Sequence, residues 1–188
     1  MRSMWHIWQG ALSSSVCDEI QSLPRSELNN ASVGISPENT SLNQDIRRSR
    51  TSFYPYNSIE AETLNKHILP FVTLANKENF GFALNNFYEL QYTEYHSTEQ
   101  GFYDWHQDII WLQPTESQRK ISVSIQLSDD DEYEGGDFEF NKDLPQPSDI
   151  RSRGTVIVFP SFLYHRVTEV TKGTRKSIVA WYEGANFN

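Results

Sequence analysis

Arg119-Lys120-Ile121-Ser122-Val123-Ser124-Ile125-Gln126-Leu127-Ser128 is the stretch of sequence that decides the fold. From Ile121 to Leu127, aliphatic side chains alternate with serine and glutamine. A repeat of two residues indicates a β-strand, because successive side chains of a strand point to opposite faces. We therefore expect residues 121–127 to form a strand with one buried face.

Further strand-like and helical segments lie on both sides of this stretch. The other expected strands are residues 4–8, 46–56, 86–95, 137–140, 155–159, 165–170 and 175–182. One helix is expected to begin at Ser15 and to fade before Pro24, and another to cover residues 58–78, where Pro70 should kink or interrupt it. Residues 29–45, which are rich in asparagine and serine, are expected to form a loop. Helices followed by many short strands predict a β-sandwich or barrel with helices packed outside.

Length, charge and cysteine content narrow the class of protein. The 188 residues suit one domain with its own core, and no repeat or linker divides them. A formal charge of −9 argues against a protein that grips a phosphate backbone, since that grip depends on lysine and arginine. Cys17 is the only cysteine, which excludes an internal disulfide and a thiolate zinc site. No apolar stretch reaches membrane-spanning length and no signal-peptide core is present, so we expect a soluble, cytoplasmic protein.

Trp105-His106-Gln107-Asp108 places an imidazole and a carboxylate two residues apart. On a strand these two side chains project from the same face, so both can point at one metal ion. A second imidazole, His165, begins a later expected strand. Two histidines and one carboxylate on one side of a metal leave coordination positions open, as in non-haem Fe(II) oxygenases. Taken singly, each of these residues also fits an ordinary structural or surface role.

Arg175 lies on the last expected strand and shares one face of it with Ser177 and Trp181. A guanidinium inside a barrel is costly to bury unless an anion meets it. The far carboxylate of 2-oxoglutarate is such an anion, because arginine binds carboxylates through a bidentate fork. The alternative is a surface arginine on an edge strand, beside two lysines.

These motifs together resemble those of the 2-oxoglutarate/Fe(II) oxygenases. The resemblance is to the prolyl 4-hydroxylase-like branch, nearest to the bacterial and phage PKHD-type hydroxylases, and it covers roughly residues 90–183. The stretches that carry it are Tyr103–Asp108, Arg119–Ser128, Tyr133–Phe138, Phe159-Pro160, His165–Val170, Gly173-Thr174-Arg175 and Trp181. Before residue 90 the match is weaker.

The resemblance implies a fold and a set of site residues. The implied fold is mainly β, a double-stranded β-helix of the jelly-roll, cupin-like kind over residues 85–183. Residues 1–84 would support it with helices, a strand and a substrate-entry loop, within one domain spanning 1–188. The implied metal ligands are His106, Asp108 and His165, and the implied co-substrate residues are Arg175, Tyr95, Ser177 and Trp181.

The reaction that the resemblance implies is hydroxylation of an unactivated C–H bond. Its cofactors would be Fe(II), 2-oxoglutarate as co-substrate and O2, with ascorbate in support. Related halogenases lack the carboxylate that Asp108 supplies here, so its presence favours hydroxylation. Peptidyl proline is the implied substrate, on family analogy alone.

Several other interpretations stay open at this point. A free amino acid or small metabolite could be the substrate in place of a peptide or protein. A non-catalytic jelly-roll binding module is disfavoured, because the implied ligands are costly to bury without a metal and an anion. A nucleic-acid demethylase is disfavoured by the acidic charge. The cluster Arg47, Arg48 and Arg50 is interpreted as a solvated strand edge, with the border of the substrate entrance as the alternative.

The remaining histidines and tryptophans have simpler interpretations. His6, His67 and His96 lack motif partners and are expected to be structural or on the surface. Trp105, Trp111 and Trp181 flank the motifs. Aromatic residues in strands are mostly core, and the alternative is that these rings wall the pocket.

Overall fold

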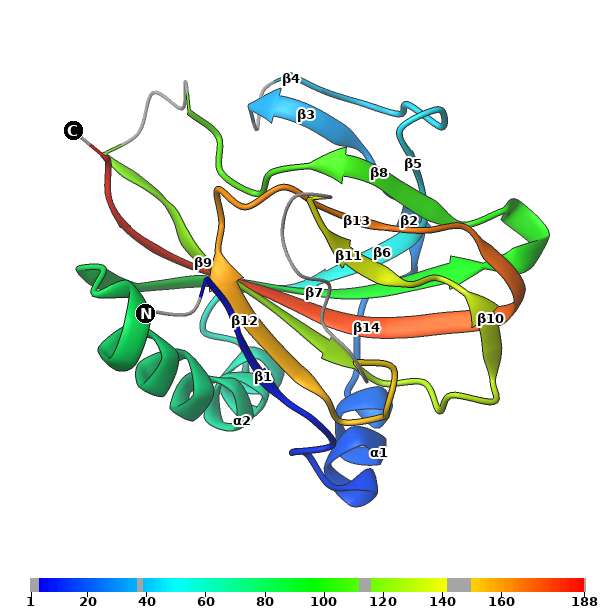
Figure 1. Cartoon of the computed structure of the whole chain (residues 1–188), viewed down its shortest axis with the longest axis horizontal. Coiled ribbons are helices and arrows are strands. Elements are labelled where there is room, and N and C mark those ends of the chain that lie inside the picture. The colour runs from blue at the N-terminus through cyan, green and yellow to red at the C-terminus, as the bar shows by residue number, and fades with distance from the viewer. Residues whose placement is uncertain (1–3, 37–38, 112–115, 142–149, 188) are drawn as a thin grey trace.

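The computed structural model describes residues 4–36, 39–111, 116–141 and 150–187. Two antiparallel β-sheets face each other, and two helices lie on the far side of the larger sheet from the smaller one (Figure 1). This arrangement confirms the expected double-stranded β-helix with helices outside.

The strands are connected in an order that interleaves the two sheets. The larger sheet runs β1 (His6–Trp8), β12 (Val156–Pro160), β9 (Ser117–Gln126), β14 (Val170–Ala185), β7 (Leu84–His96), β6 (Arg50–Tyr54) and β2 (Asn29–Asn30), and β10 (Tyr133–Gly135) also pairs with β14. The smaller sheet runs β11 (Phe138–Phe140), β13 (His165–Val167), β8 (Phe102–His106) and β5 (Arg47–Arg48). Strands that come before residue 85 therefore extend both sheets.

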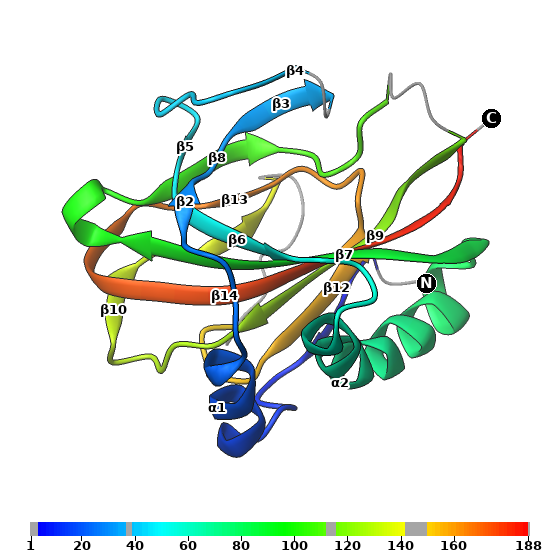
Figure 2. The same ribbon diagram turned by 180° about the vertical axis from the view of Figure 1, so that it is seen from behind.

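Two helices, α1 (Ser14–Ser22) and α2 (Ile59–Ala75), cover the outer face of the larger sheet (Figures 1 and 2). The hydroxyls of Ser13 and Ser58 cap them, so the first helix begins before the expected Ser15. Pro70 does not interrupt the second helix, because α2 continues through it. Pro70 is exposed, while Ile68 and Val72 on either side are fully buried, so packing holds the helix together. In the described chain, neither helix has the length and hydropathy needed to cross a membrane.

Strand β9 is buried on both faces, whereas the alternation predicted one buried face. Its aliphatic side chains pack under the helices, in a core with Leu64 and Ile68. Its other face, with Ser122, Ser124 and Gln126, is at most 6% exposed because the smaller sheet covers it. The polar face of β9 therefore looks into the space between the sheets, where it can serve a site.

The segment 29–45, expected to be a loop, contains short strands. Asn29–Asn30 forms β2 at the edge of the larger sheet, and β3 (Val33–Ser36) pairs with β4 (Asn39–Ser41) in a hairpin. Residues 37–38 lie outside the described chain. The hairpin lies on the side of the molecule opposite the helices (Figure 2). Its pairing partners come from within the segment, which composition alone does not reveal.

Gly173, on β14, offers a test of the close pairing between β10 and β14. Both Gly173 and Gly81 have a left-handed φ, but an added Cβ would lie 1.9 Å from the Glu132 carbonyl oxygen at Gly173 and would meet nothing within 4 Å at Gly81. Gly81→Ala should lower the free energy of unfolding by about 1–2 kcal/mol, the cost of the left-handed backbone. Gly173→Ala should cost about 1–3 kcal/mol more, because the clash is with backbone. Urea denaturation measures both, and equal losses would contradict the close approach at Gly173.

Candidate active site

A cleft of about 1010 Å³ opens between the two sheets. Residues of β7, β8, β9, β13 and β14 line it, together with β6 and residues 26–33 at one side. The site residues predicted from the sequence all line this cleft: His106, Asp108, His165, Arg175, Tyr95, Ser177 and Trp181. Folding thus brings together residues that span most of the second half of the chain.

His106 ends β8 and His165 begins β13, and the two residues lie opposite each other in the paired strands. Nε2 of His106 lies 3.7 Å from Oδ1 of Asp108, and Nε2 of His165 lies 3.6 Å from Oδ2 of the same carboxylate. One ligand atom from each of the three residues lies within 4.8 Å of the others. Two imidazoles and one carboxylate that face one point fit an Fe(II) ion.

Backbone carbonyls fix which nitrogen of each imidazole faces that point. Nδ1 of His106 donates to the Asp104 carbonyl at 2.7 Å, and Nδ1 of His165 donates to the Leu163 carbonyl at 2.9 Å. Because the hydrogen stays on Nδ1, the Nε2 lone pair of each ring is free to bind a metal.

Asp108 lies just beyond β8, and not on the same strand as His106 as the sequence pattern predicted. Its backbone N–H donates to the Ser161 carbonyl at 2.9 Å, which ties the residue to the turn between β12 and β13. The Ser122 hydroxyl, from β9, donates to Oδ2 of Asp108 at 2.7 Å and is itself 2.9 Å from the Ser161 hydroxyl. Contacts to other strands therefore aim this carboxylate, where strand alternation was expected to do so.

Electrostatics favours the protonation states that bind a metal. Burial lowers the pKa of His106 to about 3, and the neighbouring His165 adds to the shift, so the imidazole is neutral near pH 7. Burial by itself would raise the pKa of Asp108, but His165, His106 and Arg119 outweigh it and hold that pKa at about 2. Neutral imidazole and ionised carboxylate are the ligand forms of these side chains.

Arg175 begins the inner face of β14 and is 4% exposed. No carboxylate in the described part of the chain forms an ion pair with it, although a buried guanidinium is costly without an anion. Tyr95 on β7 is paired with Arg175, and the centroid of its ring lies 5.7 Å from the guanidinium carbon. Ser177 lies two residues further along the same face and is buried. A buried cation that faces a cleft without its own anion fits the far carboxylate of 2-oxoglutarate.

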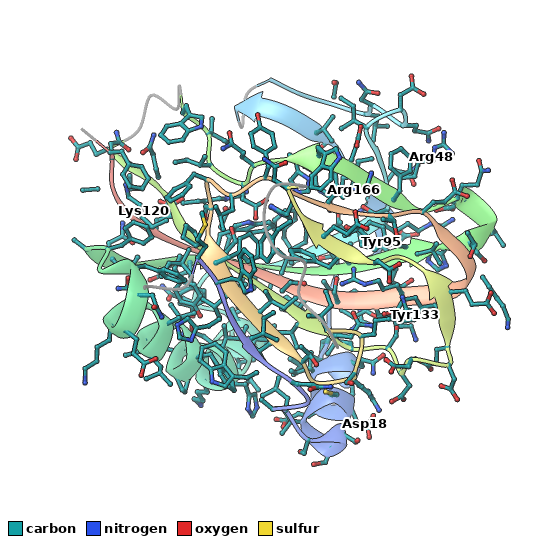
Figure 3. The ribbon with its side chains drawn as sticks, viewed as in Figure 1. Asp18, Arg48, Tyr95, Lys120, Tyr133 and Arg166 are labelled. Atoms are coloured by element: carbon teal, nitrogen blue, oxygen red, sulfur yellow. The ribbon has the colours of Figure 1, made fainter. Side chains whose placement is uncertain are left out.

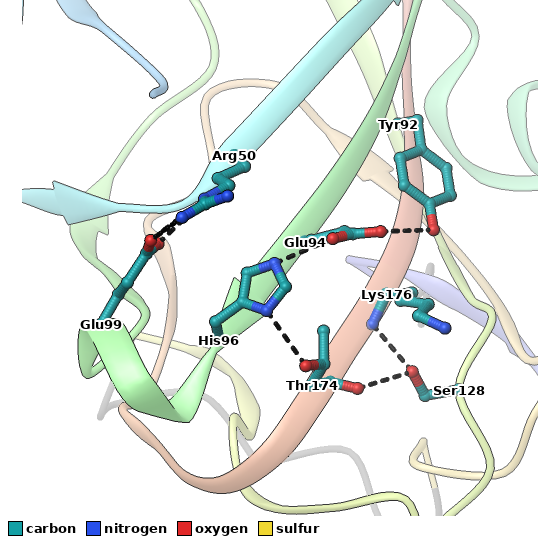
Figure 4. A network of polar contacts seen from close by, with 8 residues as sticks. All are labelled: Arg50, Tyr92, Glu94, His96, Glu99, Ser128, Thr174 and Lys176. Carbon is teal, nitrogen blue, oxygen red and sulfur yellow. Dashed lines mark hydrogen bonds and ion pairs between the residues drawn. The ribbon is translucent and has the colours of Figure 1, made fainter. Parts of the chain in front are cut away.

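A polar network joins the ends of β7 and β14 (Figure 4), through residues that alternate along these strands with Tyr95 and Arg175. His96 lies 2.8 Å from Glu94 through Nε2 and 3.1 Å from the Thr174 hydroxyl through Nδ1. The Ser128 hydroxyl donates to the Thr174 carbonyl at 3.1 Å. His96, expected to be structural or on the surface, therefore helps to fix the strands that present the buried arginine.

Trp181 forms one wall of the cleft beside an ion pair. Arg119 lies over its ring at 3.9 Å and donates to Glu89, and Phe53 stacks at a centroid distance of 6.4 Å. The indole Nε1 of Trp181 is buried and has no hydrogen-bond partner among the residues that the structure describes. Trp111 is 52% exposed and lines the cleft, which agrees with the pocket-wall alternative and not with a core position. This part of the cleft therefore contains hydrogen-bond donors, an acceptor and an aromatic surface.

Arg119 is a cleft residue that the sequence does not reveal. Strand alternation places it with Ile121 on the face of β9 that packs under the helices. A register shift between β9 and β14 falls at Tyr182/Glu183 and leaves Lys120 without a partner in the ladder. This bulge turns Arg119 into the cleft. No signal in the sequence marks such a bulge.

The interpretation of the arginine cluster as a solvated strand edge is wrong for Arg47. It is 9% exposed, its Nε donates to the Ser49 hydroxyl at 2.8 Å, and its guanidinium lies 4.4 Å from the Tyr103 ring centroid. That ring stacks on His106, and burial raises the pKa of Tyr103 to about 12. Arg47 thus reaches the cleft beside the candidate metal ligands, while Arg48 and Arg50 bond near the surface.

Comparisons with known proteins agree with this geometry. The sequence profile of the 2OG-Fe(II) oxygenase superfamily matches residues 90–183. A PKHD-type hydroxylase of Synechococcus sp. (strain CC9311) is 35% identical over 86 residues, which are 45% of this chain and 38% of that protein. The chain therefore spans about two fifths of the length of this curated relative.

Solved structures show the same fold at low sequence identity. A prolyl-4-hydroxylase of Pseudomonas putida matches with a TM-score of 0.70 and 18% identity, covering 96% of this chain and 93% of that one. A prolyl hydroxylase from Trichoplax adhaerens, in complex with a peptide fragment of the hypoxia inducible factor oxygen degradation domain, has a TM-score of 0.71 and 16% identity. This match covers 95% of this chain and 83% of the Trichoplax adhaerens chain.

Ser122→Ala tests whether the hydrogen bond to Asp108 tunes metal binding. Losing a partner of a metal ligand typically weakens metal affinity by about 10–100-fold, and we expect a loss in this range. Ser124→Ala is the matched control, since Ser124 lies on the same face of β9 and lines the cleft without a recorded bond to Asp108. Titration with Mn(II), followed by calorimetry, measures both. Equal affinities for the two variants would remove Ser122 from the metal site.

Proposed function

Because the chain belongs to the 2OG-Fe(II) oxygenase superfamily, we propose that it is an Fe(II)- and 2-oxoglutarate-dependent dioxygenase that hydroxylates a peptidyl residue. The observation that carries the proposal is one cleft that holds the His106, Asp108 and His165 cluster together with a buried Arg175, which forms no ion pair with any carboxylate that the structure describes. A metal site without an anion site, or the reverse, would not support this chemistry.

Each of these residues has a role in the proposed enzyme. His106, Asp108 and His165 would hold Fe(II), and Arg175 would bind the far carboxylate of 2-oxoglutarate. When bound, these groups supply with O2 the chemistry that turns a C–H bond into C–OH while 2-oxoglutarate becomes succinate and carbon dioxide. The protein orients them and excludes water, since the ligands and Arg175 lie between two packed sheets.

A peptide substrate is supported by polar groups of the cleft that the metal and co-substrate roles do not use. Arg47 and Arg119 offer donors, and Glu89 offers an acceptor. An extended peptide presents carbonyls and amides at regular spacing, which such a set can match. The Trichoplax adhaerens neighbour is a prolyl hydroxylase in complex with a peptide fragment, and prolyl hydroxylation is the analogy we adopt.

Succinate formation by the purified protein with Fe(II), ascorbate and 2-oxoglutarate tests the activity, with His165→Ala as the inactive variant. We expect succinate from the wild type and none from His165→Ala, whose fold should persist because the cleft tolerates a smaller side chain. Wild-type activity in a folded His165→Ala would remove His165 from the metal site. If the wild type neither forms succinate nor binds 2-oxoglutarate, the protein is a binding module and not an enzyme of this kind.

Arg175→Ala should raise the apparent Michaelis constant for 2-oxoglutarate at least about tenfold, because removing one side of a buried charge pair costs roughly 2–5 kcal/mol. Lys176→Ala is the control, since the neighbouring side chain points to the other face of β14. Initial rates of succinate formation at varied 2-oxoglutarate measure both constants. An unchanged constant in Arg175→Ala would overturn the assignment of this residue.

Arg119→Met separates substrate binding from co-substrate chemistry. We expect the Michaelis constant for a stimulating peptide to rise about tenfold, in line with roughly 1.5–3 kcal/mol for a hydrogen bond to a charged group. Substrate-independent succinate formation should stay unchanged. Arg153→Met is the control, because that arginine pairs with Asp18 away from the cleft. If free amino acids stimulate succinate formation and a panel of proline-containing peptides does not, the substrate is a small molecule.

A further inference from the structure

Arg47 is a second buried cation of the cleft, besides Arg175. It is 9% exposed and lines the cleft, and no ion pair joins it to an acidic side chain that the structure describes. Its Nε donates to the Ser49 hydroxyl, whereas its two terminal nitrogens have no hydrogen-bond partner among the described residues. Because a buried guanidinium is costly without an anion, the free edge of Arg47 is suited to a negatively charged ligand.

The other arginines of the described chain find their partners within the protein. Apart from Arg47 and Arg175, each of them donates to an oxygen of a carboxylate, a carbonyl or a side-chain amide. They are Arg25, Arg48, Arg50, Arg119, Arg151, Arg153 and Arg166. Arg47 and Arg175 are thus the two described arginines without such an acceptor, and both line the same cleft.

Strand pairing fixes where Arg47 points. Arg47 on β5 lies opposite Tyr103 on β8, so the two side chains project from the same face of the smaller sheet. The guanidinium carbon lies 4.4 Å from the Tyr103 ring centroid, and that ring stacks on the His106 imidazole at a centroid distance of 3.4 Å. One aromatic ring therefore separates Arg47 from a candidate metal ligand, and in the proposed enzyme the reacting part of the substrate lies beside that metal.

The charge available at this position favours a carboxylate. Of the cluster Arg47, Arg48 and Arg50, Arg47 lines the cleft and the other two do not. Arg48, labelled in Figure 3, lies on the edge strand of the smaller sheet and donates to Gln100, and Arg50 pairs with Glu99. One guanidinium balances one carboxylate and can hold it through a bidentate fork, whereas a phosphate group carries a charge of about −1.5 to −2.

We propose that Arg47 is a second anion site of the cleft and that it binds a carboxylate of the substrate, close to the C–H bond that is hydroxylated. This inference rests on the proposed function and deepens it, because it makes the substrate an acidic one. The carboxylate belongs either to an aspartate or glutamate beside the reacting residue or to a free C-terminal end. A neutral twin of such a substrate is rejected, since it leaves the buried cation without a counter-charge.

The co-substrate is the rival occupant of this position, because 2-oxoglutarate itself carries two carboxylates. The variant that separates the two is Arg47→Met, which removes the charge and keeps an unbranched apolar chain over the Tyr103 ring. Arg48→Met is the matched control: it is the next residue on β5, its side chain projects from the other face, and it does not line the cleft. A role toward the substrate leaves 2-oxoglutarate binding unchanged in both variants.

The experiment titrates matched peptides into protein loaded with Mn(II) and 2-oxoglutarate, in a buffer free of other carboxylates, and follows binding by calorimetry. Mn(II) replaces Fe(II) so that no turnover occurs. One set of blocked peptides carries aspartate on one or the other side of proline, and its neutral twins carry asparagine. A further pair ends in proline with a free carboxylate or with an amide. The set that shows a preference identifies the source of the carboxylate.

We expect the wild type to bind the acidic member of one of these pairs at least about tenfold more tightly than its neutral twin, as a hydrogen bond to a charged group predicts. Arg47→Met should bind both members with the affinity of the neutral twin. Its affinities for Mn(II) and 2-oxoglutarate should match those of the wild type. Arg48→Met should keep the wild-type preference.

Each other outcome has a distinct meaning. A wild type without a preference for any acidic member, or a preference that survives in Arg47→Met, overturns the inference. Weaker 2-oxoglutarate binding in Arg47→Met assigns the residue to the co-substrate and also overturns it. A wild type that binds Mn(II) but not 2-oxoglutarate overturns the proposed function itself. If Arg47→Met fails to fold, Arg47→Gln decides by the same criteria, since its amide can still donate to the Ser49 hydroxyl.

Discussion

The antiparallel pairing of β8 with β13 is the contact on which the rest of the site depends, because it sets His106 opposite His165. The turn before β13 supplies the Ser161 carbonyl that holds Asp108, and the Ser161 N–H in turn donates to the Lys120 carbonyl of β9. The smaller sheet thus carries the histidines, and its connection to the larger sheet carries the carboxylate. A shift of this pairing by one residue would turn one imidazole away from the other.

Buried polarity is the second constraint, and it explains why the inner face of β9 is serine and glutamine. Asp108 accepts a hydrogen bond from the Ser122 hydroxyl, and the Gln126 amide donates one to the buried Tyr133 hydroxyl. Apolar side chains at these positions would pack equally well but would leave buried polar groups unsatisfied. The outer face of β9 has no buried polar group to satisfy, and its aliphatic side chains pack under the helices.

The site residues were more predictable than the means by which they are held. His106, Asp108 and His165 could be selected by ligand type and spacing, yet Asp108 is aimed by Ser161 and Ser122 where strand alternation was expected to aim it. Pro70 was expected to disturb a helix that continues through it, because local propensity is weaker than the packing of Ile68 and Val72. Arg47 looked like part of a solvated cluster, because the ring of Tyr103 that receives it lies far away along the chain.

By itself the sequence determined the β class of the fold, the helices before it, the identity of the candidate metal ligands and the candidate anion-binding Arg175. These follow from periodicity and from short motifs, which are local properties of the chain. Only the tertiary structure decided that the polar face of β9 is buried and that Arg119 and Arg47 enter the cleft. The physical reason is that strand register, a bulge at Lys120 and the approach of two sheets are set by contacts between distant segments, and no local pattern records them.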